Sequence, residues 1–171
     1  MTRLENLQNK IVSLEEAKRR MGIWRNAGLK VAFTNGCFDI LHKGHVTYLT
    51  QASEYANRLV VGLNSDASVR QQGKGPNRPI NDEEARRTVL AGLGVVDLVV
   101  LFDEETPLKL IEELLPDFVA KGADYDPEET DVTSKKYIVG KEIMEKTGGK
   151  VIAIPLVEGF STTGIIEKLA K

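Results

Sequence analysis

The 171-residue sequence contains one cysteine, two histidines and one tryptophan, and neither sign of charge is in large excess. Because Cys37 is alone, the chain forms no intrachain disulfide and no cysteine-rich metal site. The formal net charge of -2 argues against binding nucleic acid through a broad basic surface. No apolar run approaches membrane-spanning length, and the first residues, MTRLENLQNK, lack the apolar core of a signal peptide. These absences favour a cytoplasmic enzyme or binding domain with no nucleic-acid or membrane partner.

Short apolar runs alternate with amphipathic segments along almost the whole chain. Such runs are typical of strands buried on both faces of a parallel sheet, and repeated strand–helix–strand order implies right-handed crossovers. We therefore predict an α/β fold: a Rossmann-like, doubly wound parallel sheet of five strands with helices on both faces. The predicted strands are Val31–Thr34, Leu59–Leu63, Leu98–Leu101, Phe118–Lys121 and Val151–Ile154. The predicted helices are Leu14–Ala27, Gly44–Tyr55, Asp82–Leu93, Pro107–Leu115, Lys135–Lys146 and Thr162–Lys171.

The first predicted helix stands apart from the strand–helix alternation. It begins at a capping box, Ser13-Leu14-Glu15-Glu16, and ends before Gly28. We expect it to form an N-terminal helical extension, residues 1–29, in front of a main domain at residues 30–171.

Ligands of a doubly wound sheet bind outside the carboxyl ends of the strands. The loops that follow the predicted strands are Asn35–Lys43, Asn64–Pro79, Gly122–Thr133 and Pro155–Thr163, and they hold most of the unusual residues. These loops predict a single site at one edge of the sheet.

The first of these loops contains both histidines of the chain, in the segment TNGCFDILHKGHVTYL. His42 and His45 are three residues apart, so they face the same way in a helical turn, and Gly44 keeps bulk away from a ligand. Gly36 permits close approach of the backbone, and the start of the helix offers free N–H groups to a phosphate. Imidazoles there can stabilise a phosphoryl group as its charge redistributes. Two ordinary packed histidines, or a zinc site completed by Asp39, are the alternatives, although a zinc site without Cys or a nearby Glu is a poor match.

This loop resembles a known signature. Residues 36–45, GCFDILHKGH, are similar to the G-x-F-D-x-x-H-x-G-H motif of the nucleotidyltransferase superfamily. Residues 158–166, EGFSTTGII, resemble its second motif, with Phe160 in place of the usual isoleucine. Alone, Ser161–Thr163 would be read as a helix cap; beside the first motif, these residues are expected to bind phosphate.

Two further loops fit the same family. Arg70, Lys74 and Arg78 lie in a Gly- and Pro-containing stretch, and a flexible basic loop suits closure over a triphosphate, although it could also be a solvated surface loop. Residues 121–125, KGADY, resemble an element of the sugar-phosphate adenylyltransferases. Over nearly the whole chain, the resemblance is greatest to the adenylyltransferases that activate heptose 1-phosphate for lipopolysaccharide or S-layer precursors.

The resemblance implies transfer of AMP from ATP to a sugar 1-phosphate with Mg²⁺, a homodimer, and a separate heptose kinase. The alternatives are a cytidylyltransferase acting on glycerol 3-phosphate or a similar acceptor, or a nucleotide-binding domain without turnover. Leu156 stands where the glycerol-3-phosphate cytidylyltransferases have an arginine, which weakens the first alternative. The implied catalytic residues are His42, Lys43, His45, Lys74 and Arg86. The implied nucleotide- and acceptor-binding residues are Asn35, Gly36, Cys37, Phe38, Asp39, Gly44, Asn64, Asp66, Lys121, Gly122, Asp124, Tyr125, Ser161, Thr162 and Thr163, with Asp39 also expected at the metal.

Overall fold

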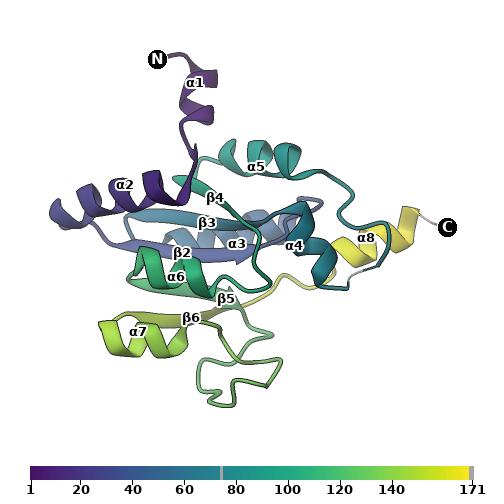
Figure 1. The fold of residues 1–171 in the computed structure, drawn as a ribbon. Coiled ribbons are helices and arrows are strands. Elements are labelled where there is room, and N and C mark those ends of the chain that lie inside the picture. The colour runs from purple at the N-terminus through teal and green to yellow at the C-terminus, as the bar shows by residue number, and fades with distance from the viewer. Residues whose placement is uncertain (74, 170–171) are drawn as a thin grey trace.

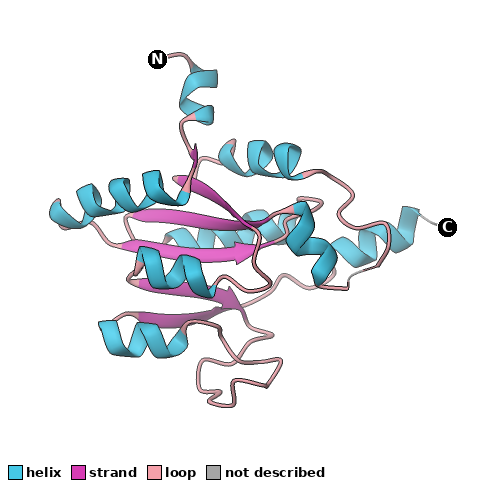
Figure 2. Cartoon of the chain, viewed as in Figure 1, coloured by secondary structure: helices cyan, strands magenta, loops and turns pink. Residues whose placement is uncertain are grey.

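The computed structural model describes residues 1–73 and 75–169, which form one sheet with helices packed on both of its faces (Figure 1, Figure 2). The strands are β1 (Ile11–Val12), β2 (Val31–Gly36), β3 (Arg58–Asn64), β4 (Leu98–Phe102), β5 (Phe118–Gly122) and β6 (Lys150–Ile154). The helices are α1 (Arg3–Gln8), α2 (Leu14–Asn26), α3 (Lys43–Ser53), α4 (Asp66–Gln71), α5 (Glu83–Ala91), α6 (Leu108–Leu114), α7 (Lys141–Thr147) and α8 (Thr162–Leu169).

All strand pairs of the sheet are parallel, and the strand order is β1-β4-β3-β2-β5-β6. The chain moves outward from β2 to β3 and β4, then crosses back to place β5 on the other side of β2. The strand order therefore reverses beside β2, and the crevice at such a switch point is where ligands bind in folds of this kind. The predicted fold class is confirmed.

Alternating side chains of the buried strands build two cores. Val31 and Phe33 of β2 point to one face, where α2, α6 and α7 pack, whereas Ala32 points to the other face, where α3 and α5 pack. Figure 1 shows the same arrangement, with α2, α6 and α7 in front of the sheet and α3 behind it. Burial on both faces explains why the strands read as continuous apolar runs.

The sheet has six strands where five were predicted. The additional strand, β1, contains only two residues, too few for a recognisable pattern, and it pairs with β4 at one edge of the sheet. The leading segment is therefore part helix and part strand, and Ala17 and Met21 of α2 are buried in the core. The boundary at residue 30 stays a prediction.

Three helices also differ from expectation. α1 and α4 were not predicted; each is six residues long and begins at a side-chain cap, Thr2 and Ser65 respectively. The helix predicted from Lys135 begins only at Lys141, because Gly140 has a left-handed backbone with φ 90°. None of the described helices is long and apolar enough to cross a membrane.

Candidate active site

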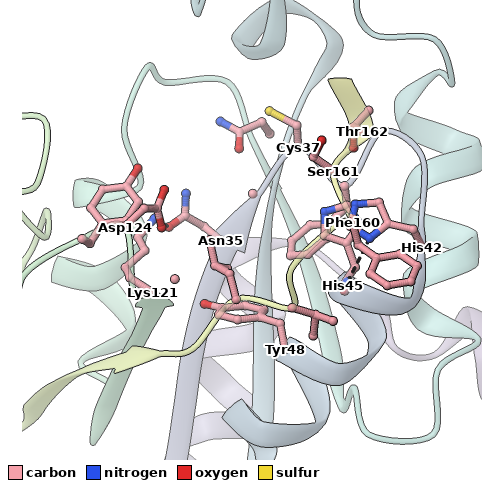
Figure 3. Close-up of a pocket in the computed structure, with 18 of the residues that line it drawn as sticks. Asn35, Cys37, His42, His45, Tyr48, Lys121, Asp124, Phe160, Ser161 and Thr162 are labelled. Carbon is pink, nitrogen blue, oxygen red and sulfur yellow. Dashed lines mark hydrogen bonds between the residues drawn. The ribbon is translucent and has the colours of Figure 1, made fainter. Parts of the chain in front are cut away.

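A cavity of about 480 Å³ opens at the carboxyl ends of β2, β3, β5 and β6. His42, His45 and Phe160 lie together on one side of it, whereas Lys121 and Asp124 lie on the other side (Figure 3). The structure brings most of the predicted site residues to its wall. These are Asn35, Gly36, Cys37, Phe38, His42, Gly44, His45, Asn64, Lys121, Gly122, Asp124, Tyr125, Ser161 and Thr162.

The two histidines are held by the first turn of α3. His42 is the N-cap residue, and its Nδ1 accepts a hydrogen bond from the backbone N–H of His45 at 3.3 Å. A neutral imidazole that accepts at Nδ1 carries its proton on Nε2, so His42 keeps an N–H donor for the cavity. The two rings stack with centroids 3.9 Å apart and an interplanar angle of 18°.

Both histidines are neutral near pH 7. Burial lowers the pKa of His42. Burial, together with the neighbouring His42, lowers the pKa of His45 to about 4, against a smaller opposing effect of the Ile40 backbone carbonyl. Burying a charged imidazole costs free energy, and two stacked cations would repel each other. The pair therefore offers hydrogen bonds to a phosphate without a permanent positive charge.

The lowered pKa of His45 predicts that stability depends on pH in a defined window. The folded chain binds fewer protons than the unfolded chain between the ordinary pKa of 6.5 and the folded value of about 4. His45 should therefore make its full contribution to the free energy of unfolding above that window, and this contribution should fall as the pH falls through it. Guanidinium unfolding at about pH 7.5 and about pH 5 would measure the fall, and His45→Gln should reduce it. An equal fall in both proteins would contradict the burial of His45 as its cause.

Two glycines let the walls of the cavity approach each other closely. A Cβ atom on Gly44 would lie 3.0 Å from the His42 ring and 3.1 Å from Cβ of Phe160. A Cβ atom on Gly122 would lie 2.5 Å from Oδ1 of Asp124 and 2.9 Å from a methyl group of Leu156. In the second case the side chains of Asp124 and Leu156 would have to move to make room, so Gly122 allows their present positions at the cavity wall.

The side of the cavity opposite the histidines is polar. Nζ of Lys121 donates a hydrogen bond to Oδ1 of Asn35 at 2.5 Å and lies 5.2 Å from the ring centroid of Tyr125. Tyr48 of α3 also lines the cavity; its hydroxyl group lies 2.7 Å from that of the buried Thr34, and burial raises the pKa of Tyr48, so it stays protonated. Lys121, Asn35 and Tyr48 can therefore exchange hydrogen bonds with hydroxyl groups of a ligand.

Asp39 is engaged by the protein itself. Its carboxylate accepts hydrogen bonds from the backbone N–H groups of Ile80 at 2.8 Å and Asn81 at 2.9 Å, and from Nε of Arg78 at 2.5 Å. Burial raises the pKa of Asp39, but these donors outweigh burial and hold its pKa below the usual range. With a side chain that is 0% exposed, Asp39 does not fit the predicted role of metal ligand. Among the described residues, no group of three or more His, Cys, Asp or Glu could hold a metal ion.

Arg86 lies under the cavity rather than facing it. Its guanidinium donates to the backbone carbonyls of Cys37 and Asn64, each at 2.7 Å, and of Asn81 at 3.0 Å. It also pairs with Asp66 at 2.8 Å, and its side chain is 0% exposed. Arg86 thus ties together the loops after β2 and β3 and the segment before α5, and neither it nor Asp66 lines the cavity. The structure does not place Arg86 at the phosphates, where the resemblance put it.

The remaining predicted residues lie near the cavity or outside the described chain. Nζ of Lys43, the first residue of α3, lies 5.5 Å from the centroid of the Phe160 ring, but Lys43 does not line the cavity. Asp39 and Thr163 line a smaller adjoining cavity. Lys74 lies outside the described residues.

Five cavity residues were absent from the predicted set. Tyr48 follows His45 by three residues on α3, a spacing that could have identified it. The others lie in the loops predicted to follow β3 and β6, but the sequence does not show which side chains of those loops face the cavity. They are Gln72, Leu156, Val157 and Phe160.

Comparison with known proteins identifies the family. Residues 33–168 match the family described as cytidylyltransferase-like. The chain belongs to the cytidylyltransferase-like family. The match includes every predicted site residue, and it makes this chain a nucleotidyltransferase by family.

Individual relatives agree with this assignment. The chain is 52% identical over 159 residues to the "Bifunctional protein HldE" of Mesorhizobium japonicum, and 49% identical over 162 residues to the protein of the same name from Magnetococcus marinus. These alignments cover 93% and 95% of the chain but only 30% and 31% of the relatives, so the chain spans less than a third of their length. A crystal structure of the lipopolysaccharide core biosynthesis protein from Thermoplasma volcanium has a TM-score of 0.58 and 32% identity, covering 76% of this chain and 98% of that one. Pantothenate synthetase from Thermus thermophilus shares the fold, with a TM-score of 0.54 and 19% identity over 86% of this chain and 62% of that one.

Proposed function

We propose that this cytidylyltransferase-like chain moves AMP from ATP to heptose 1-phosphate, giving ADP-heptose and pyrophosphate. The observation that carries the proposal is the stacked, neutral pair of His42 and His45 at the start of α3, on the wall of the cavity. The names of the similar proteins, HldE and a lipopolysaccharide core biosynthesis protein, support a heptose acceptor.

The reaction is a direct in-line displacement. An oxygen of the sugar phosphate attacks the α-phosphorus of ATP, and the bond from that phosphorus to the bridging oxygen of pyrophosphate breaks. No side-chain nucleophile is needed, so positioning and charge stabilisation account for catalysis. His42 and His45 donate hydrogen bonds to the α-phosphate, where the five-coordinate transition state forms.

The rest of the cavity divides between the two substrates. Ser161, Thr162 and Thr163 at the start of α8 hold the β- and γ-phosphates, with Lys43 and Lys74 adding positive charge. The acceptor sugar lies near Asp124 and the other polar residues opposite the histidines, where its hydroxyl groups find acceptors. The carboxylate of Asp39 is already engaged by Arg78 and Ile80, so a Mg²⁺ ion would be supplied with ATP and would neutralise part of the charge of its phosphates.

Several further properties rest on the resemblance alone and are part of the proposal. We propose a homodimer in the cytoplasm, where ATP is available, and a separate kinase that supplies the phosphorylated heptose. A cytidylyltransferase with another phosphorylated acceptor is the second candidate. It is disfavoured by the apolar Leu156, which lines the cavity where such enzymes have an arginine.

Release of pyrophosphate tests the proposal directly. The purified protein is offered ATP or CTP, each with heptose 1-phosphate or glycerol 3-phosphate, in the presence of Mg²⁺. We expect release only with ATP and the heptose. Turnover with another pair would assign the chain to a neighbouring branch of the family. Binding of nucleotide without turnover of any pair would contradict the proposed reaction.

A further inference from the structure

A second, smaller cavity adjoins the main one at the histidine end. It has a volume of about 320 Å³ and shares with the main cavity the wall formed by Cys37, Phe38, His45 and Thr162. A ligand that places a phosphate beside His45 can therefore extend into this second space without leaving the protein surface.

Among the residues that the structure describes, Arg78 supplies the one arginine or lysine side chain on the wall of the second cavity. Arg78 was not among the predicted site residues. From the sequence, it was named only as one of three basic residues in the loop after β3. Its side chain is 11% exposed, and its Nε donates to Oδ2 of Asp39 at 2.5 Å. In the part of the chain that the structure describes, neither Nη group of Arg78 has a hydrogen-bond partner. Because the guanidinium is planar and rigid, fixing Nε leaves the Nη groups as two aligned donors, a geometry that matches a phosphate.

Asp39 fixes the orientation of Arg78, and Asp39 is itself held in place by other hydrogen bonds. Besides Arg78, its carboxylate accepts the backbone N–H groups of Ile80 and Asn81, and Nδ2 of Asn81 donates to the Asp39 carbonyl at 2.5 Å. These bonds attach the segment carrying Arg78 to the loop after β2, which also carries the histidine motif. The bonds from Ile80 and Asn81 hold the segment in addition to the bond from Arg78.

The chemistry of the second cavity is that of an anion site. Thr162 and Thr163 line it from the first turn of α8, together with Arg78. Hydroxyl groups and a guanidinium are donors, and the one carboxylate on the wall is already paired with the guanidinium. The hydroxyl groups of a sugar could accept some of these hydrogen bonds but carry no charge, whereas phosphate oxygens accept them and also compensate the charge of the guanidinium.

We propose that Arg78, oriented by Asp39, binds the β- and γ-phosphates of ATP and stabilises pyrophosphate as it leaves. The inference rests on the proposed function. As the acceptor oxygen bonds to the α-phosphorus, the electron pair of the breaking bond moves to the bridging oxygen of pyrophosphate. The guanidinium of Arg78 compensates the charge that grows there. Arg78 is thus a catalytic residue, and Asp39 is a positioning residue that acts through it.

Binding of fragments separates this role from a structural one. AMP lacks the β- and γ-phosphates, whereas pyrophosphate consists of them alone. We expect Arg78→Met to weaken binding of pyrophosphate and to lower kcat/KM for ATP by roughly 10–100-fold, with binding of AMP unchanged. Arg78→Lys should restore part of the loss, because it returns charge but not the two aligned donors. Asp39→Asn should shift pyrophosphate binding in the same direction by less.

The control is Arg19→Gln, which removes an arginine from α2 whose side chain is 63% exposed and which lines neither cavity. It should leave both fragments unaffected. Unchanged pyrophosphate binding in a folded Arg78→Met protein, or equal weakening of AMP and pyrophosphate, would overturn the inference. Should Arg78→Met fail to fold, Arg78→Lys is compared with the wild type in its place. Weaker binding of pyrophosphate with unchanged binding of AMP would support the inference, and any other result would overturn it. A wild-type protein that binds pyrophosphate through Arg78 but turns over no sugar phosphate would contradict the proposed function and leave this site standing.

Discussion

We expect replacement of His45 by alanine to lower turnover by roughly 10²–10³-fold while ATP affinity changes only a few-fold. A donor aimed at charge that develops in the transition state contributes far more to rate than to ground-state binding. His45 is neutral and stacked on His42, so its contribution is a directed hydrogen bond rather than a bulk positive charge. Losing that bond leaves the proposed triphosphate sites at α8 and Arg78 intact, so we expect ATP still to bind.

The measurement is kcat by pyrophosphate release, set beside the dissociation constant for ATP by calorimetry. Val46→Ala is the matched control, because Val46 is the next residue on α3, is 42% exposed and lines neither cavity. It should match the wild type in both quantities. Equal losses of kcat and ATP affinity in His45→Ala would mean that the imidazole binds substrate and transition state alike, against the catalytic role proposed for it.

The location of this site followed from the sequence for a physical reason. The carboxyl ends of parallel strands meet at one edge of the sheet, so loops after separate strands must converge. Residues as distant as Asn35 of β2, Lys121 of β5 and Ser161 before α8 do line one cavity. Identifying strands and naming the residues that follow them was enough, because the topology does the rest.

The orientation of individual side chains could not be obtained in this way. Asp39 and Arg86 are conspicuous charges in or near the motifs, and a charge near a phosphate loop is naturally assigned to the ligand. The structure turns both inward, against backbone groups of neighbouring loops. Nothing in the sequence marks which backbone N–H or carbonyl will be the partner of a charged side chain, since nearly every residue has both. The short strand β1 was not predicted for a similar reason, because two residues are too few to show the alternation of a strand.

The buried position of Arg86 leads to the largest expected effect on stability. We expect Arg86→Met to lower the free energy of unfolding by about 3–5 kcal/mol, which for a chain of this size is roughly 10 °C in Tm. Methionine fills a similar volume but donates no hydrogen bond. The carbonyls of Cys37, Asn64 and Asn81 would lose their donor, and Asp66 would lose its partner. Buried acceptors left without donors carry their full desolvation cost.

Arg87→Met is the matched control on the same helix. Arg87 pairs with Glu84, whose side chain is 67% exposed, and such a surface pair within one helix contributes below about 0.5 kcal/mol. Guanidinium and thermal unfolding of the two variants and the wild type would measure the difference. A lysine at position 86 should recover little of the loss, because a single ammonium cannot reach acceptors in three separate segments in the way that a planar guanidinium does.

The same pair of variants decides what Arg86 does for the reaction. Tying the loops after β2 and β3 to the start of α5 fixes the cavity wall between Cys37 and Asn64, so Arg86→Met should impair ATP and acceptor alike. A phosphate ligand would behave differently: its loss would weaken ATP binding while stability stayed near that of Arg87→Met. If Arg86→Met leaves stability unchanged but selectively lowers the affinity for ATP, Arg86 binds the phosphates after all. A large fall in stability with parallel losses for both substrates is the result that a buried tie between loops requires.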